Sequence, residues 1–185
     1  MGDHGSALAA LGLAPAPAAR LEAYLELLER WGSRVNLTGA RGAERRVAVL
    51  VAPVLPLLEL VVGPLLDVGS GNGSPGLVLA LLRPELSVTL LEPRQRRWAF
   101  LCEAARTAGR PDLRVLRLRH DAYPGPPAAT VTLRALRLPA AQLLRLVEAG
   151  GQLLALGQAL EAHPELLPRP APPGVFRYEH RPRST

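Results

Sequence analysis

The sequence predicts an α/β fold in which a parallel sheet is covered by helices on both faces. Short apolar segments typical of strands alternate with longer helical segments, and this alternation implies parallel strands joined by crossover helices. At 185 residues, 48% of them hydrophobic, the chain is long enough for one sizeable core and short for two. A glycine-rich segment, Gly69–Gly76, follows the first strand candidate, where such sheets bring backbone close to a ligand.

The N-terminal third is predicted to be helical. Apolar residues recur at three- and four-residue steps over about 17–33, which predicts an amphipathic helix that ends near Gly32. The apolar stretch 47–68 is about as long as a membrane span, but prolines, glycines and carboxylates interrupt it. We expect a buried helix, a turn and a strand there, and no membrane association. Residues 1–60 are therefore interpreted as a helical extension packed on a core of residues 61–185.

The core is predicted to alternate strands and helices up to Gly157. The predicted strands are 65–68, 87–91, 113–118, 130–133 and 151–156, and the predicted helices are 77–82, 94–108 and 139–148. The first of these helices stops before Pro84, and Gly109 ends the second. Beyond Gly157 the chain is rich in proline, and only 175–178 is predicted to be a strand.

Composition limits the function classes. The single cysteine, Cys102, excludes an internal disulfide and a multi-cysteine metal site, so we expect a reducing cytoplasm and no metal. The N-terminus has no basic segment before an apolar core, so no secretion signal is expected. The formal net charge is +6 and every basic residue is arginine, which either RNA binding or biased codon usage explains.

The glycine-rich segment predicts a nucleotide-type ligand. Its spacing Gly71-x-Gly73-x-x-Gly76 matches the dinucleotide fingerprint, but Asp67 stands on the strand end, two residues before a Gly69-x-Gly71-x-Gly73 triplet. An acidic residue in that register is typical of Rossmann-like methyltransferases and favours S-adenosylmethionine over NAD. Glu92, at the end of the second predicted strand, could accept both ribose hydroxyls of either ligand.

Further motifs make the resemblance specific. Asn36-Leu37-Thr38, the loop from Asp67, Thr89-Leu90-Leu91-Glu92, Arg119-His120-Asp121 and Leu133-Arg134-Ala135 follow one another in order. In these motifs the chain resembles the 16S rRNA guanine-N7 methyltransferase family, also called the glucose-inhibited division protein B family, over about residues 21–157.

The resemblance implies a class I S-adenosylmethionine-dependent methyltransferase fold and a cytoplasmic, monomeric enzyme acting on 16S rRNA in the small ribosomal subunit. The cofactor-binding residues that it implies are Asp67, Gly69, Gly71, Ser74, Glu92, His120, Asp121 and Arg134. Arg134 and Arg137 are candidates for positioning the substrate, because the planar guanidinium pairs well with phosphate.

The residue types also bear on the reaction. Pyrimidine C5 methylation needs a cysteine nucleophile, and Cys102 lies within a predicted helix, where a packing role is expected. Guanine N7 carries a free lone pair, so its methylation needs placement and no general base. Arg94, Arg96 and Arg97 are interpreted either as a basic rim or as a solvated helix start.

Two features depart from the family pattern. Members carry Arg-His-x-x-Asp-Ser where this chain has the apolar segment Ala48–Pro53, and a lysine typical of the fifth strand's end is missing. The alternatives are therefore a relative that binds the cofactor without methylating rRNA, a methyltransferase acting on another substrate, and a nicotinamide-binding enzyme on the same sheet.

Overall fold

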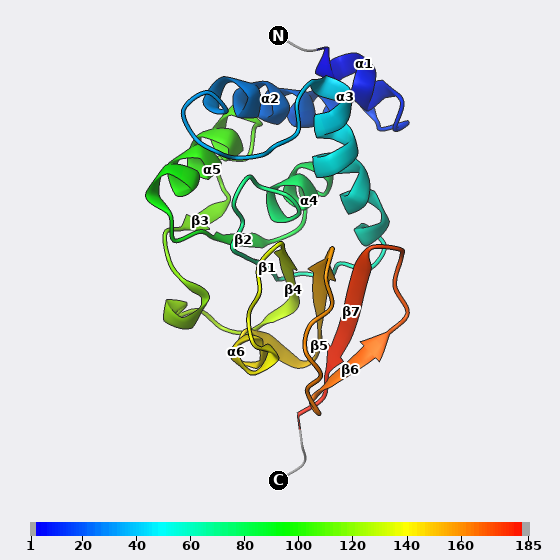
Figure 1. Cartoon of the computed structure of the whole chain (residues 1–185), viewed down its shortest axis with the longest axis vertical. Coiled ribbons are helices and arrows are strands. Elements are labelled where there is room, and N and C mark those ends of the chain that lie inside the picture. The colour runs from blue at the N-terminus through cyan, green and yellow to red at the C-terminus, as the bar shows by residue number, and fades with distance from the viewer. Residues whose placement is uncertain (1–2, 183–185) are drawn as a thin grey trace.

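A computed structural model describes residues 3–182, which form a seven-stranded sheet with most of the helices on one face and the short helix α6 (Ala140–Leu144) on the other (Figure 1). The strand order is β3-β2-β1-β4-β5-β7-β6. Strands β1 to β5 are parallel, whereas β7 runs antiparallel to both of its neighbours, β5 and β6. The strands are β1 (Leu65–Val68), β2 (Val88–Leu91), β3 (Arg114–Leu116), β4 (Ala128–Arg134), β5 (Val147–Leu156), β6 (Leu166–Arg169) and β7 (Val175–His180).

The helices fall before and between these strands. They are α1 (His4–Ala9), α2 (Pro15–Trp31), α3 (Ala43–Arg46), α4 (Gly76–Leu82), α5 (Gln95–Thr107) and α6 (Ala140–Leu144). A π-helical turn, Val47–Val51, and a 3₁₀ turn, Ala52–Leu57, continue directly from α3. Within residues 3–182 no helix is both long enough and apolar enough to cross a bilayer.

The sheet separates two hydrophobic clusters. All four residues of β1 are buried, as expected for a central strand covered on both faces. Leu65 packs with residues of α2, α4 and α5, whereas its neighbour Leu66 packs with residues of α6 and with Tyr178 of β7. Successive side chains of a strand point to opposite faces, so one strand supplies both clusters.

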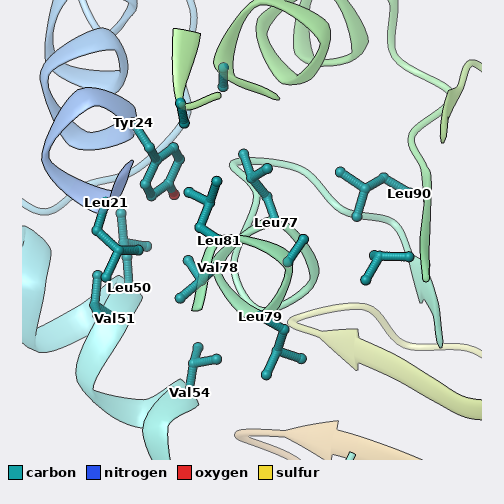
Figure 2. Packing of buried hydrophobic residues seen from close by; sticks show 14 of the residues in the cluster. Leu21, Tyr24, Leu50, Val51, Val54, Leu77, Val78, Leu79, Leu81 and Leu90 are labelled. Atoms are coloured by element: carbon teal, nitrogen blue, oxygen red, sulfur yellow. The ribbon is translucent and has the colours of Figure 1, made fainter. Parts of the chain in front are cut away.

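Helix α4 lies at the centre of the larger cluster. Figure 2 shows Leu77, Val78 and Leu81 of α4 beside Tyr24 of α2 and Leu50 of the π-helical turn. All five side chains are at most 1% exposed. The N-terminal helices therefore share a hydrophobic core with the sheet.

The structure confirms the predicted α/β class and most elements, but two predictions at the C-terminal half were wrong. The helix predicted over 139–148 ends at Leu144, and β5 begins at Val147, four residues earlier than predicted. Val147 pairs with Ala128 across a register shift in β4, so sheet hydrogen bonds override the helix propensity of this segment. Strand β6 was not predicted, because an edge strand containing Pro168 lacks an alternating apolar pattern. Helix α1 was also missed.

Candidate functional site

A cleft of about 780 Å³ opens at the carboxyl ends of the parallel strands, where ligands bind in open α/β sheets. Its walls come from the loops after β1, β2, β3 and β4 and from two N-terminal segments, the turn after α2 and the π-helical turn. The lining includes Leu37, Thr38, Val49, Leu50, Gly69, Gly71, Asn72, Ser74, Glu92, Arg97, Leu118, His120, Arg134 and Leu136.

The glycine-rich loop forms the floor of the cleft. Gly69 has φ +72°, a backbone conformation that favours glycine, and a Cβ there would lie 2.7 Å from Leu136 Cδ2 and displace that side chain. The amides of Gly69 and Ser70 both donate to the carbonyl of Leu91 at 2.9 Å, which fastens the loop to the end of β2. At the far end of the loop, a Cβ on Gly76 would lie 2.4 Å from Asp67 Cβ. Glycine thus lets α4 begin directly against β1.

Asp67 lies beneath this loop and does not line the cleft. Its side chain is 1% exposed, and its Oδ1 accepts a 2.6 Å hydrogen bond from the hydroxyl of Thr132 on β4. Burial raises the pKa of Asp67 to about 6, against the opposing effect of the Thr132 and Ser70 hydroxyls. The position of this carboxylate suits it to support the loop from below.

Glu92 lines the cleft at the end of β2 and is 2% exposed. Its Oε2 accepts from the amide of Gly71 at 3.0 Å, and its Oε1 accepts from the amide of Arg94 at 2.8 Å. These bonds hold the carboxylate in one orientation. Each carboxylate oxygen has a further lone pair, so Glu92 retains the capacity to accept two hydroxyl donors of a ligand.

Arg134, at the end of β4, joins the glycine-rich loop to the π-helical turn. Its Nη1 donates to Ser74 Oγ and its Nη2 to the carbonyl of Val49, both at 2.8 Å. The Ser74 hydroxyl in turn donates to the carbonyl of Leu50, also at 2.8 Å. The apolar segment Ala48–Pro53, which departs from the family pattern, therefore contributes backbone carbonyls to this wall.

Arg134 carries its positive charge in a partly buried position among neutral hydrogen-bond partners. The side chain is partly buried, and desolvation lowers its pKa. Among residues 3–182, no carboxylate lies within ion-pair distance of Arg134; its hydrogen-bond partners are a hydroxyl and a carbonyl. A cation without a counter-ion at a cleft favours an anionic ligand group.

The remaining predicted site residues lie in different places. His120 is 7% exposed, lines the cleft and contacts Gln142 Oε1 through its Nε2 at 2.9 Å. Asp121, the next residue, is exposed and does not line the cleft, but it forms a 3.2 Å ion pair with Arg119, which does. Arg137 is exposed too and lines a separate, smaller pocket beside Glu161.

Several cleft residues were not among the predicted contacts. Asn72 donates to the carbonyl of Leu37 at 3.1 Å and accepts from the amide of Ser74 at 3.0 Å, so it ties the glycine-rich loop to the turn after α2. Leu118 and Leu136 form apolar walls. Their positions directly after β3 and β4 are the signal that could have identified them, because parallel strands end at the same edge.

The described part of the cleft holds no cysteine and no free acid–base pair. Cys102 lies within α5, outside the cleft lining, and burial raises the pKa of its thiol. Residues 3–182 contain no group of three or more His, Cys, Asp or Glu side chains placed to bind a metal ion. What the cleft offers is shaped backbone, the fixed carboxylate of Glu92 and several arginines, which suit binding and placement of reactants.

The topology narrows the class of protein. In the dinucleotide-binding fold the sheet continues from the fifth strand to a parallel sixth, whereas here the antiparallel β7 is inserted between β5 and β6. With an acidic residue at the end of β1 and a second at the end of β2, this arrangement is that of S-adenosylmethionine-dependent methyltransferases.

Comparison with known proteins gives the family. The profile of rRNA small subunit methyltransferase G matches residues 18–168 of the chain. The chain belongs to the rRNA small subunit methyltransferase G family, so the predicted resemblance is confirmed.

Individual relatives carry the same name. A ribosomal RNA small subunit methyltransferase G from Neisseria gonorrhoeae is 39% identical over 118 residues, which cover 63% of this chain and 57% of that protein. One from Alkalilimnicola ehrlichii is 39% identical over 165 residues, covering 86% of this chain and 75% of that protein. The chain thus spans somewhat more than half the length of the first relative and three quarters of the second.

Solved structures support the fold. An RNA methyltransferase from Salinibacter ruber, determined in complex with S-adenosyl-L-homocysteine, superposes with a TM-score of 0.51 at 19% identity. The match covers 65% of this chain and 82% of that chain. At this identity the likeness concerns the fold, and it confirms the predicted methyltransferase architecture.

Proposed function

We propose that this protein transfers the methyl group of S-adenosylmethionine to N7 of a guanine in 16S rRNA, acting as a cytoplasmic monomer on the small ribosomal subunit. The observation that carries the proposal is the cleft itself. A glycine-rich turn, the fixed carboxylate of Glu92 and the unpaired charge of Arg134 meet at the carboxyl edge of a methyltransferase sheet. The names of the family and of its relatives support the rRNA substrate.

The residues of the cleft fit the two ends of the cofactor. Glu92 would accept the ribose hydroxyls, and the loop around Gly69 and Gly71 would lie against the rest of the ligand, since no side chain blocks its backbone. His120 lines the wall after β3 and would contact the adenine. Arg134 would face the carboxylate of the methionine part or an anionic group of the substrate.

Asp67 and Asp121 are proposed to act less directly. Asp67 would support the loop from beneath, because its side chain is buried away from the cleft. Asp121 is exposed and does not line the cleft, although its ion-pair partner Arg119 does, so Asp121 would act from the rim. Arg137 is likewise outside the cleft lining, which leaves Arg134 as the stronger candidate for placing the substrate.

Methylation at N7 suits a cleft without a free general base. The carboxylate of Glu92 already accepts hydrogen bonds from two backbone amides, and the ring of His120 is hydrogen-bonded to the side chain of Gln142. The N7 lone pair attacks the sulfonium methyl directly: the new N–C bond forms as the S–C bond breaks, and its electron pair stays on sulfur. The cationic charge passes from sulfur to the base, so no proton has to be removed. Placement in line with the methyl group supplies the rate.

The test combines binding with product analysis. Calorimetric titration with S-adenosylmethionine should show binding, and incubation with tritiated cofactor and undermodified 30S particles should label the 16S rRNA. Nuclease digestion followed by mass spectrometry should identify the product as 7-methylguanosine. Binding without transfer would indicate a relative that keeps the cofactor pocket alone, and a label on another atom or molecule would refute the proposed substrate.

A further inference from the structure

A second hollow, which we call the arginine groove, lies between the end of α2 and the start of α5, two helices that pack side by side (Figure 1). Its volume is about 600 Å³. Its lining is Leu27, Arg30, Trp31, Arg34, Val35 and Arg96. Half of these residues are arginines, all three are exposed, and the lining contains no carboxylate.

The positive charge of the groove is poorly compensated by the protein. Residues 3–182 form eight ion pairs, and none of them includes Arg30, Arg34 or Arg96. These three arginines therefore have no carboxylate oxygen of the described residues within 4 Å. Arg106, and to a lesser extent Arg30, lowers the pKa of Glu103, but that carboxylate is hydrogen-bonded to Arg106. The groove is therefore complementary to an anion.

Trp31 adds a fixed aromatic ring to the charged groove. Its ring packs edge-on against Phe100 with centroids 5.8 Å apart, and Phe100 is fully buried. This contact holds the indole in place, while the half-buried ring also lines the groove. Arginines beside a fixed aromatic ring are what proteins use to bind single-stranded nucleic acid, because phosphates meet the charges and bases stack on the ring.

The groove adjoins the cofactor cleft. Val35 lines the groove and Leu37 lines the cleft, so their Cα atoms lie at most about 7.6 Å apart along the chain. On α5, Arg96 lines the groove and its neighbour Arg97 lines the cleft. Arg97 also donates to the carbonyl of Asn36 at 3.1 Å, which joins the two walls. An RNA chain with its target base in the cleft would place the neighbouring nucleotides at the groove.

We propose that the arginine groove binds the single-stranded rRNA next to the target nucleotide, with Arg34 and Arg96 on phosphates and Trp31 against a base. The proposal rests on the proposed rRNA substrate. Under this reading Arg34 and Arg96 contact the substrate outside the cofactor pocket, so they set RNA affinity and leave cofactor affinity unchanged.

Charge-reversal variants distinguish RNA binding at the groove from a general effect of the protein's net charge. The variants are Arg34→Glu, Arg96→Glu and the matched control Arg114→Glu, which also replaces an exposed arginine and changes the charge by two units. Arg114 begins the edge strand β3, at the opposite end of the strands from the cleft. Arg96→Glu places a carboxylate in the first turn of α5, where the helix dipole favours an anion, so its melting temperature should not fall.

The measurements are affinity for an unmodified 16S rRNA transcript over a range of salt concentrations, affinity for S-adenosylmethionine, and the KM for 30S particles. We expect Arg34→Glu and Arg96→Glu to weaken RNA binding by about tenfold or more at low salt, and to reduce the salt slope by about 1. KM for 30S should rise in parallel. Arg114→Glu should stay within about twofold of wild type, and all variants should bind the cofactor normally.

Other results would overturn the proposal. An equal loss in all three variants would show a general charge effect, and unchanged RNA binding in Arg34→Glu and Arg96→Glu would exclude the groove. Polyglutamate that binds as tightly as RNA, with the same dependence on these arginines, would identify an acidic protein as the occupant. If the groove variants lose RNA affinity but the wild type forms no 7-methylguanosine, the groove stands and the proposed function fails.

Discussion

The buried carboxylate of Asp67 makes the stability of this protein depend on pH in a defined window. Its pKa is about 6 in the folded protein against 3.8 for the free side chain, chiefly because burial disfavours the charged form. Between these values the folded state binds more protons than the unfolded state. The free energy of unfolding therefore falls as the pH rises from about 4 to about 6, and the loss is complete above that range.

The size of this loss follows from the shift. One pKa unit corresponds to about 1.4 kcal/mol, so a shift of about two units costs about 3 kcal/mol at neutral pH. Asp67→Asn keeps the shape of the side chain and an oxygen for the Thr132 hydroxyl, but it has no charge to bury. Relative to wild type, this variant should gain about 3 kcal/mol between pH 4 and pH 7, whatever its constant offset.

Urea unfolding at several pH values between 4 and 8 would measure this difference, since groups other than Asp67 titrate alike in both proteins. Thr132→Val serves as a second variant: it removes a hydroxyl that stabilises the charged carboxylate, so the pKa of Asp67 should rise further and the loss of stability should be larger and extend to higher pH than in wild type. Parallel pH profiles for wild type and Asp67→Asn would refute the reasoning and show that the carboxylate is solvated or otherwise compensated.

Three further variants probe the cleft. Gly69→Val should abolish cofactor binding in calorimetry, because valine disfavours φ +72° and its side chain would displace Leu136, which lines the cleft; undiminished binding would remove the loop from the site. Arg134→Ala should reduce methyl transfer at least about tenfold while shifting the unfolding free energy by about 1–3 kcal/mol, the range for lost hydrogen bonds; a stability loss that accounts for the whole activity loss would make this arginine structural. Glu92→Gln should weaken cofactor binding by about tenfold through loss of a charged acceptor, with S-adenosylhomocysteine affected equally; normal affinity would exclude a ribose contact.

Local signals in the sequence explain why much of the fold could be predicted. Strands β1, β2 and β4 are apolar runs bounded by glycine, proline or charged residues, and the glycines after β1 predict the loop there. The errors occur where local signals are weak. Helix propensity placed residues 145–148 in a helix, but pairing with β4 draws Val147 into the sheet.

The candidate site was likewise predicted in part. Gly69, Ser74, Glu92, His120 and Arg134 were predicted from their motifs, and all of them line the cleft. The motif Arg119-His120-Asp121 also suggested Asp121, and Arg137 was a candidate for positioning the substrate, but both lie outside the cleft lining in this structure. Neighbouring residues such as His120 and Asp121 point to different surroundings. The spacing of residues in the sequence does not show which of two neighbours after a strand will face the cleft.

The sequence by itself determined the fold class, the alternation of strands and helices from β1 to β4 and the nature of the ligand site, because periodicity, glycine spacing and strand-end carboxylates are local properties of the chain. Only the tertiary structure decided what Arg134 contacts. Its acceptors include the carbonyl of Val49, 85 positions earlier in the chain, and backbone carbonyls have no sequence signature. The arginine groove likewise exists because α2 packs on α5, which brings Arg34 and Arg96 together from distant segments.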